Sequence, residues 1–555
     1  AADFLRPGGA AVVVESTEQG NGLKLVVKGY EEPLVEAPEA TKPRVSTDEG
    51  EGRRPPGLTD DKDEEEGAPE PVTPGHIAAH LFRSLHGSNN LVFPNSRREV
   101  ERYTHLLNKL CADLQVPNEF WPHHGSLSKE IRSETESALK QKELPATAIC
   151  TSTLELGIDI GAVKSVAQIG SPPSVASLRQ RLGRSGRRKG EPAILRAYVE
   201  EDELGNNPSL ATELRLHTVE TVAMVDLLTQ NWFEPPRAGG SHFSTLIQQI
   251  LSVIAQRGGA SIVELYELLC APNAPFAGTT KKEFAELVRH LGERELLMQD
   301  SSGELLHGTL GEKFVNHYSF YASFATEEEF RIIAAGRTLG TMPVTQMLTV
   351  GQRILFAGKT WKVESVDEEQ KAVYVRRTGG GTPPLFSGGA GRKHTRVRQR
   401  MRELLEAADS PAYLDPKAAA LLAQGRTAYA ARGLAQACYI EQGRQVQLMT
   451  WLGDSANETL ACLLIRRGYE ATAGGPAVEV QLGQRTVSDV MDALGDAAVD
   501  GAPPLEVLLA NVKNLQREKW DWALPQSLLR KSYASLNLEI EEALVWARQA
   551  AAFEG

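Results

Sequence analysis

The sequence is poor in cysteine and has no long apolar run. Its 555 residues include five cysteines, which stand singly without a CxxC pair. A disulfide scaffold and a zinc ribbon both need paired cysteines, so neither is expected. No apolar stretch approaches the roughly 20 residues of a membrane-spanning helix, and the opening AADFLRPGG lacks the basic and apolar regions of a secretory signal. We therefore expect a protein without membrane contact in the reducing cytoplasm.

Excess negative charge, which would argue against a nucleic-acid partner, is concentrated in one segment. Residues 31–70 hold fourteen Asp and Glu against five Lys and Arg, a net of −9 out of −12 for the whole chain. This segment is rich in Pro and Gly and nearly lacks aromatic and β-branched residues, so it cannot bury enough surface to offset the entropy of ordering. We predict a disordered linker or insertion over residues 34–75.

Strand-like and helix-like patterns alternate over residues 76–205. The predicted helices span residues 76–85, 97–110 and 128–139, and short apolar runs predict strands over 146–150, 163–170 and 193–200. Such alternation predicts an α/β domain with a parallel sheet that is covered by helices on both faces.

Helices dominate after residue 205. Three helices and two short extended runs around SSG are the parts of a winged helix, which we predict within residues 206–313. Residues 314–555 mix strand-like runs with amphipathic helices and predict an accessory α+β domain. Trp361 alternates with Val363 in one of these runs, as on a packed sheet face.

The segment QRLGRSGR, residues 180–187, places three arginines three residues apart. On a helix, Arg181, Arg184 and Arg187 would share one face, where their charges repel unless an anion lies among them. Planar guanidinium groups suit phosphate oxygens, so phosphate contact is one interpretation. A solvated basic helix face is the other, and the segment alone does not decide between them.

A second segment, TSTLELGIDIGAV over residues 151–163, begins where a predicted strand ends. Ser152 and Thr153 could offer hydroxyl groups to a phosphate chain, and the loop with Gly157 and Asp159 could offer amides and a carboxylate to a ribose. Taken alone, the segment is also compatible with an ordinary connection between a strand and a loop.

Four segments occur in the order and at the spacing of helicase motifs. Together with LVFPNSRR (residues 91–98) and HHGSLSKEIR (residues 123–132), the two segments above resemble motifs IV, V and VI of superfamily-two helicases. IGSPPSVASLRQRLGRSGRR, the winged-helix pattern and the later ASFATEEEFRI, GRTLGTMPV and PPLFSGGAGRKHTRVRQRM resemble the large helicase-related (Lhr) family of ATP-dependent DNA helicases. Arg187 departs from that family, which often has His there, and keeps the general superfamily arginine.

The resemblance implies a RecA-like second motor domain over residues 76–205, preceded by the tail of a first motor domain over residues 1–33. It also implies 3′ to 5′ movement along DNA, driven by ATP, with Mg²⁺ held by the first motor domain. The implied partners are single-stranded or tailed duplex DNA, an RNA:DNA hybrid as a further substrate, and a first motor domain supplied in cis or in trans.

The resemblance also implies roles for individual residues. Arg184 and Arg187 match arginine fingers that reach the γ-phosphate of ATP and neutralise charge during phosphoryl transfer. The other positions expected to contact nucleotide are Gly157, Asp159, Gln180 and Arg181. The positions expected to contact strand phosphates are Ser96, Arg97, Gly125, Ser126, Ser152 and Thr153. Ser128 is expected to cap the helix that follows, whose free amides form a phosphate site.

Two features of a complete ATPase are missing from the sequence. The one GKT, at residues 358–360, has Arg353 where the first glycine of a phosphate loop belongs, and it lies between two strand-like runs, as in a hairpin turn. DEEE at residues 63–66 and DEEQ at residues 367–370 lie in the acidic linker and in a predicted turn, not after the apolar strand that precedes a magnesium site. We therefore predict that this polypeptide alone hydrolyses no ATP.

The densest remaining basic run is GRKHTRVRQRMR at residues 391–402. At helical spacing Arg392, Arg396 and Arg400 would align, and we predict that they contact the strand backbone. A solvated helix face is the alternative.

His123 and His124 are adjacent, but no nearby Cys or carboxylate completes a ligand set, so we predict no metal.

The leading functional hypothesis is that the chain is the C-terminal part of an ATP-dependent helicase. The alternative is a nucleic-acid clamp that acts without ATP, or a subunit of a split helicase.

Overall fold

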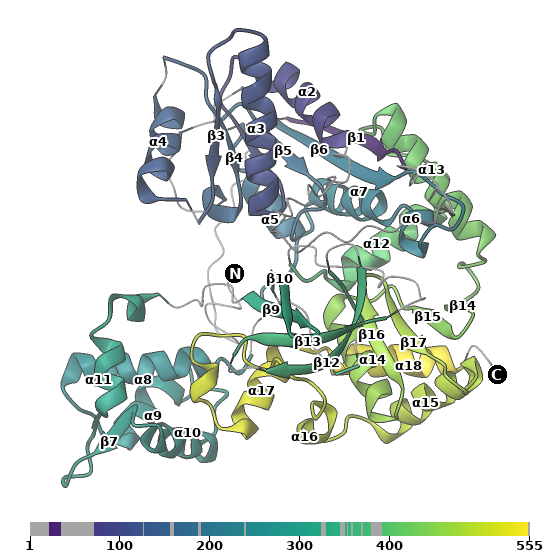
Figure 1. Cartoon of the computed structure of the whole chain (residues 1–555). Helices are drawn as coiled ribbons and strands as arrows, with labels where there is room; N and C mark the ends of the chain where they lie inside the picture. The colour runs from purple at the N-terminus through teal and green to yellow at the C-terminus, as the bar shows by residue number, and fades with distance from the viewer. Residues whose placement is uncertain are drawn as a thin grey trace, which may run out of the picture.

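The computed structural model describes most of the chain, and Figure 1 shows how its elements are arranged. The described residues are 22–34, 72–125, 127–141, 143–155, 160–161, 163–186, 190–237, 240–322, 329–343, 350–351, 353–356, 359–367, 370–378 and 391–552. Several predictions fall outside them. These concern most of the acidic segment 34–75 and the site residues Ser126, Gly157, Asp159 and Arg187.

A six-stranded parallel sheet lies in the N-terminal part of the described chain, with strand order β1-β6-β5-β2-β4-β3. Its strands are β1 (Leu23–Glu32), β2 (Asn90–Phe93), β3 (Phe120–His123), β4 (Thr147–Cys150), β5 (Ser165–Ile169) and β6 (Ala193–Asp202). Every residue of β2, β4 and β5 is buried, as expected for parallel strands covered on both faces.

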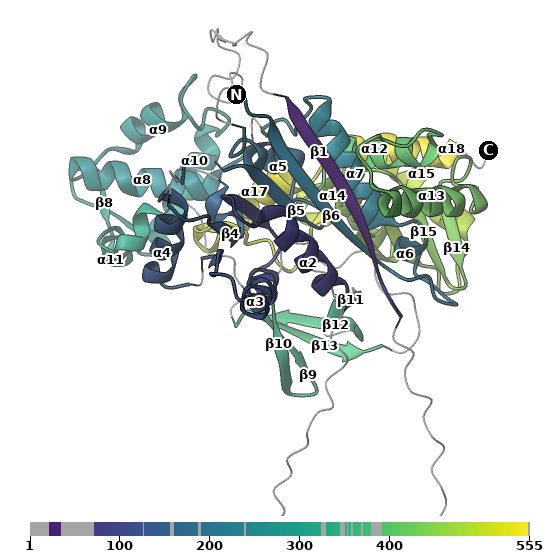
Figure 2. The same ribbon diagram turned by 90° about the horizontal axis from the view of Figure 1, so that it is seen from above.

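Helices cover both faces of this sheet (Figure 2). On β2, Leu91 and Phe93 belong to one apolar core, while Val92, on the opposite face, belongs to another. The helices that cover Val92 are α2 (Thr73–Leu85) and α3 (Arg97–Asp113), and those that cover the other face are α4 (Lys129–Lys140), α5 (Val175–Leu182) and α7 (Leu216–Thr229). The predicted α/β fold is confirmed for this part of the chain.

Strand β1 corrects one predicted domain boundary. Residues 1–33 were expected to belong to a first motor domain, but β1 pairs with β6 in parallel over ten residue pairs, from Leu23↔Ala193 to Glu32↔Asp202. The sequence separation of about 170 residues hid this pairing. The described part of residues 1–33 therefore belongs to the same sheet as residues 76–205.

The middle of the outer side of β1 is covered by a distant segment, so this part of the sheet edge is closed. Val27 donates its backbone amide to the carbonyl of Tyr413 (2.9 Å) and accepts from the amide of Asp415 (2.9 Å). The Asp415 carboxylate accepts from the amide of Gly29 (3.0 Å) and caps α13 (Pro416–Ala431). Contacts of this kind protect an edge strand from pairing with another chain.

Gly29 is predicted to be essential for this closure. A Cβ atom at Gly29 would lie 2.5 Å from the backbone nitrogen and 2.8 Å from the Cα of Ala418, both of which are backbone atoms. We expect Gly29→Val to lower the free energy of unfolding by about 1–3 kcal/mol or more, as overpacking does. Gly75→Ala, where nothing lies within 4 Å, is the control. Equal urea midpoints for the two variants would contradict the prediction.

A helical unit follows, with the three helices and the hairpin that the sequence predicts. They are α8 (Phe243–Arg257), α9 (Ile262–Cys270), α10 (Lys281–Glu293), β7 (Leu297–Gln299) and β8 (Leu305–His307). Ser261 and Thr280 form capping boxes that fix where α9 and α10 begin. The short elements next to this unit and α7 in the chain are α6 (Leu210–Glu213), α11 (Thr309–Val315) and a 3₁₀ turn at Tyr318–Tyr321. Another 3₁₀ turn, Ser152–Leu154, follows β4.

Two further sheets follow residue 314. The five-stranded sheet contains β9 (Glu329–Ala334), β10 (Arg337–Pro343), β11 (Arg353–Phe356), β12 (Lys359–Asp367) and β13 (Ala372–Arg377). Phe356 pairs with Lys359 in the antiparallel β11–β12 pair, so Lys359 and Thr360 of the GKT sequence begin β12, while Gly358 lies outside the described residues. Trp361 is buried in the core of this sheet together with Val363, which confirms the packed sheet face.

The second sheet has strand order β14-β15-β17-β16 and is covered by helices. Its strands are β14 (Tyr439–Gln442), β15 (Gln445–Met449), β16 (Glu470–Gly474) and β17 (Ala477–Gln481). The helical elements of this part of the chain are α12 (Thr395–Glu406), α14 (Asp454–Arg466), α15 (Val487–Asp500), α16 (Leu505–Leu508), a 3₁₀ turn at Asp521–Ala523, α17 (Gln526–Asn537) and α18 (Ile540–Ala552). Throughout the part of the chain described, none of the helices is long and apolar enough to span a membrane.

The predicted boundaries after residues 205 and 313 do not separate independent cores. One apolar core contains residues of α8–α10 together with residues of β15, β17, α14 and α18. The core beneath α7 includes Val397 and Met401 of α12 and Leu422 of α13. The accessory region is therefore packed against both the parallel sheet and the helical unit, because its amphipathic helices bury their apolar sides there.

Candidate nucleotide and nucleic-acid interface

Parallel strands bring most of the predicted strand-contacting residues to one edge of the six-stranded sheet. Ser96 and Arg97 follow β2, Gly125 follows β3, and Ser152 and Thr153 follow β4. The carboxyl ends of neighbouring parallel strands lie at the same edge, which is where open α/β sheets bind ligands. Thr153 is half-buried at this carboxyl edge and the other four residues are exposed.

Two helices begin at the carboxyl edge with serine caps. Ser96 accepts a hydrogen bond from the amide of Glu99 (3.2 Å) at the start of α3. Ser128 accepts one from the amide of Ile131 (3.4 Å) at the start of α4, which confirms the predicted cap. The partial positive charge at both helix starts favours an anion at this edge.

The two adjacent histidines hold the turn after β4 in place. The Nδ1 atom of His123 lies 2.8 Å from the hydroxyl oxygen of Thr153, which also donates to the His123 carbonyl (3.1 Å). Burial lowers the pKa of His123, which favours a neutral ring. His124 contacts the Glu101 carboxylate through Nε2 at 2.6 Å. Among the residues that the structure describes, no group of three or more potential metal ligands occurs.

The arginine segment does not form one helical face. Helix α5 ends at Leu182, so Arg181 is its last arginine and Arg184 follows in a turn. Gly186 has φ +69°, and a Cβ there would lie 2.7 Å from the backbone nitrogen of Ala193. The glycines thus end the helix and let the chain pass close to β6. This corrects the expected shared face.

Arg181 is a buried positioning residue rather than a ligand-facing one. Only 3% exposed, it donates from Nε to the Glu155 carboxylate at 3.0 Å and from Nη1 to the Gln168 side-chain oxygen at 2.5 Å. Its guanidinium also lies 4.7 Å from the ring centroid of Phe93. The predicted contact between Arg181 and nucleotide is therefore wrong for the structure described, since its guanidinium is enclosed by protein groups.

Arg184 is tied to the same acidic residue. Its Nε and Nη2 atoms donate to the backbone carbonyl of Glu155 at 3.2 and 2.8 Å, and the residue is 8% exposed. The amide of Val163, just before β5, donates to the Arg184 carbonyl at 3.3 Å. The backbone of Arg184 therefore lies near the amino end of β5, while its guanidinium reaches the end of the turn that follows β4. Gln180, which lies on α5 four residues before Arg184, is exposed.

We use the name Glu155 junction for Glu155, Arg181, Arg184 and Gln168. Sequence reasoning missed Glu155 and Gln168, although a polar residue in the apolar strand SVAQI is a usable signal. Gln168 is fully buried, and its amide donates to the side chain of Asn95 at 3.2 Å. The junction therefore links the arginine turn, the turn after β4 and the loop that precedes Ser96.

The basic run of residues 391–402 is engaged within the protein. Arg392 pairs with Glu458 at 2.9 Å, Arg396 with Glu403 at 2.5 Å, and Arg400 with Asp226 at 2.8 Å. These arginines are therefore paired within the protein, and their predicted contact with the strand backbone stays a prediction. These arginines face acidic side chains of α7, α12 and α14, which the sequence pattern could not reveal.

Acidic residues near the carboxyl end of β6 give the fold a pH dependence. Burial, followed by the charges of Glu32 and Glu99, raises the pKa of Glu200 from its ordinary 4.5 to about 7. The folded state thus binds this proton more tightly than the unfolded state, and its stability falls as pH rises from about 4.5 to 7. We expect Glu200→Gln to raise the melting temperature at pH 8 but not at pH 4. An equal shift at both pH values would contradict this.

Comparisons with known proteins fit this geometry. Residues 75–189 match the model of the helicase conserved C-terminal domain. The chain is 40% identical over 133 residues to an Lhr helicase/probable uracil glycosylase of Mycolicibacterium smegmatis, covering 19% of this chain and 9% of that protein. It is 27% identical over 285 residues to an ATP-dependent helicase Lhr-Core of Methanocaldococcus jannaschii, covering 49% and 31%.

A solved structure supports the same fold over a greater length. The structure of Mycobacterium smegmatis helicase Lhr bound to ssDNA and AMP-PNP matches 100% of this chain and 71% of that chain, with a TM-score of 0.62 and 18% identity. The matched stretches span less than a third of the length of the two curated relatives. Residues 75–189 therefore carry a helicase conserved C-terminal domain, and the chain is similar to the C-terminal portion of Lhr-type superfamily-two helicases.

Proposed function

We propose that this chain provides the second motor domain and accessory region of an ATP-dependent, 3′ to 5′ DNA helicase or translocase. A first motor domain, in cis or in trans, would bind most of the nucleotide. The observation that carries the proposal is the Glu155 junction. It joins Arg184, near the amino end of β5, to the turn with Thr153 at the carboxyl edge.

The carboxyl edge has the chemistry to hold a strand by its phosphates. Exposed Ser96, Arg97 and Ser152 offer hydroxyl and guanidinium donors, and α3 and α4 direct their amino ends there. None of these groups reads a base, so binding is expected to be independent of sequence. Single-stranded DNA, the free tail of a tailed duplex and one strand of an RNA:DNA hybrid are all compatible ligands.

The arginine turn fits the phosphates of ATP. Arg184 and exposed Gln180 carry donor groups suited to an anionic nucleotide. We propose that Arg187, Gly157 and Asp159, which lie outside the described residues, also contact the nucleotide, Asp159 through the ribose. ATP supplies the phosphoryl group that is transferred. The guanidinium groups would neutralise its oxygens, and closure of two motor domains would bring them there. Within the described ranges no three-residue ligand group suits Mg²⁺, so we assign its ligands to the first motor domain.

The helical unit would act on duplex DNA. Helices α8–α10 and the β7–β8 hairpin have the order of a winged helix, a module that places a helix or a hairpin against the duplex. We propose that it engages the duplex ahead of the strand held at the carboxyl edge.

The competing function is a clamp that binds DNA without ATP. The missing phosphate loop in the 555 residues favours it. In that case, addition of a first motor domain and nucleotide leaves strand affinity unchanged, whereas the motor proposal predicts a nucleotide-dependent change.

Strand binding by the purified chain tests the proposal. We expect a single-stranded oligonucleotide to bind independently of sequence, with an affinity that falls as salt rises. Arg97→Ala should weaken binding and reduce the slope of log affinity against log salt by roughly 1. Arg466→Ala, at an exposed arginine on α14, is the matched control. A chain that binds no strand at low salt, or equal salt slopes for the two variants, would contradict the proposal.

A further inference from the structure

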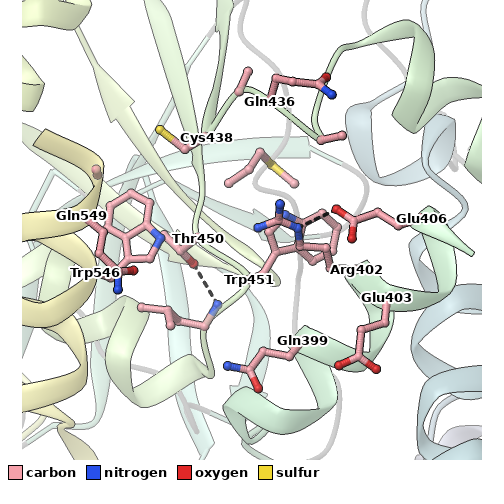
Figure 3. A pocket seen from close by; sticks show the side chains of 15 residues that line it. Gln399, Arg402, Glu403, Glu406, Gln436, Cys438, Thr450, Trp451, Trp546 and Gln549 are labelled. Carbon is pink, nitrogen blue, oxygen red and sulfur yellow. Dashed lines mark hydrogen bonds and ion pairs between the residues drawn. The ribbon is translucent and has the colours of Figure 1, made fainter. Parts of the chain in front are cut away.

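A pocket of about 380 Å³ opens between α12, the end of β15 and α18 (Figure 3). It lies outside the interface described above, and its volume is within the range of small-ligand sites, about 300–1,000 Å³. Trp546 of α18 borders one side, and Gln399, Arg402 and Glu403 of α12 border the other. Arg402 and Glu403 follow Gln399 by three and four positions, so both lie on the same helix face as Gln399.

The lining carries both signs of charge. Arg402 donates from Nε to Glu406 at 2.8 Å, and Glu406 also accepts from the Tyr429 hydroxyl at 2.7 Å. Glu403 accepts from Arg396 and Arg400. The two carboxylates disfavour a phosphate, and both are already paired with arginines, which disfavours a metal cation. The pocket therefore suits a ligand that is neutral and has both donors and acceptors.

A flat heteroaromatic ligand fits these walls. Trp546 is partly exposed and supplies an indole face for stacking. The exposed amides of Gln399 and Gln549 each offer one donor group and one acceptor. Donors and acceptors beside an aromatic face are the groups that recognise a nucleobase that has left its stack.

We propose that this pocket receives one nucleobase of the strand that the carboxyl edge holds. The inference rests on the proposed function, and α12 supplies the physical connection. Just before α12, Lys393 donates from Nζ to the carbonyls of Pro172 (2.7 Å) and Pro173 (3.1 Å), in the loop that follows β5 at that edge. The helix has 12 residues, which corresponds to about 18 Å. A few nucleotides bridge that distance.

Binding to two matched oligonucleotides tests this site with the full chain. One is an ordinary single strand and the other carries abasic residues, which keep the phosphates and remove the bases. Trp546→Ala should weaken binding of the ordinary strand roughly tenfold and leave the abasic strand unaffected. The double variant Gln399→Ala and Gln549→Ala changes exposed side chains only and should act in the same direction. Gln526→Ala, at an exposed glutamine on α17, is the control.

Quenching of tryptophan fluorescence by free adenosine separates failure of this site from failure of the proposed function. If no strand binds but adenosine quenches saturably, and the double glutamine variant removes that quenching, the proposed function fails and the pocket remains a nucleobase site. If strands bind while Trp546→Ala has no effect, or has the same effect on both strands, the pocket inference is overturned. Absence of both strand binding and quenching also overturns it.

Discussion

Replacing Arg398 by methionine is expected to cause the largest loss of stability of any single substitution considered. Arg398 and Glu220 have side-chain exposures of 2% and 1%, and they are 2.6 Å apart. A second nitrogen of Arg398 contacts Asp454 at 3.0 Å. Despite burial, which favours the protonated acid, the charges of Lys393 and Arg398 lower the pKa of Glu220. The buried carboxylate depends on these cations.

Removal of one partner from a buried ion pair costs about 3–5 kcal/mol, because the other charge stays buried. We therefore expect urea unfolding of Arg398→Met to show a loss of that size. Because the pair joins α7 to α12 and α14, the accessory region should also become more accessible to protease.

Arg376→Met is the matched control for this substitution. Arg376 pairs with Glu364 at 3.0 Å, but both side chains are more than half exposed. Pairs of that kind contribute about 0–1 kcal/mol. If the two variants unfold at the same urea concentration, the buried contacts of Arg398 with Glu220 and Asp454 do not hold the accessory region in place.

Replacing Arg184 and Arg187 by alanine is expected to have the largest effect on catalysis. In a chain joined to a first motor domain, removal of arginine fingers should reduce ATP turnover by roughly 10³–10⁵-fold. Strand affinity should stay within about twofold in the absence of nucleotide, because the strand contacts lie at the carboxyl edge. Turnover and strand binding would be measured on the same preparations.

Arg179→Ala provides the control for the arginine turn. Arg179 lies on α5 close to the other arginines, but it is exposed and contacts Asn231 at 3.3 Å. Its removal should leave turnover nearly unchanged. A comparable loss in this variant would indicate a general effect of positive charge, and unchanged turnover in the double variant would favour the clamp.

Local patterns predicted much of the fold because parallel strands and amphipathic helices have strong periodicities. The buried strands β4 and β5 and the helices α3 and α4 lie where the sequence predicts them, with serine caps at the helix starts. Strand β1 was assigned to another domain because nothing in residues 23–32 indicates a partner about 170 residues away.

The site was predicted less completely, because charged residues take their roles from distant partners. Arg398 and Glu220 are 178 positions apart, so the run of residues 391–402 resembled a strand-binding surface instead of an internal junction. Arg181 has the sequence features of a phosphate ligand, yet Glu155 and Gln168 enclose it. Conversely, Thr153 was predicted correctly to follow a strand end, because position after a strand is a local property.

The central claim is that this chain supplies arginines to a nucleotide held mainly by another domain. The most direct measurement is DNA-stimulated ATP turnover by the 555-residue chain alone and by the same chain combined with a first motor domain. We expect no turnover by the chain alone and robust turnover by the combination. Turnover by the chain alone that survives replacement of Arg184 and Arg187 would contradict it.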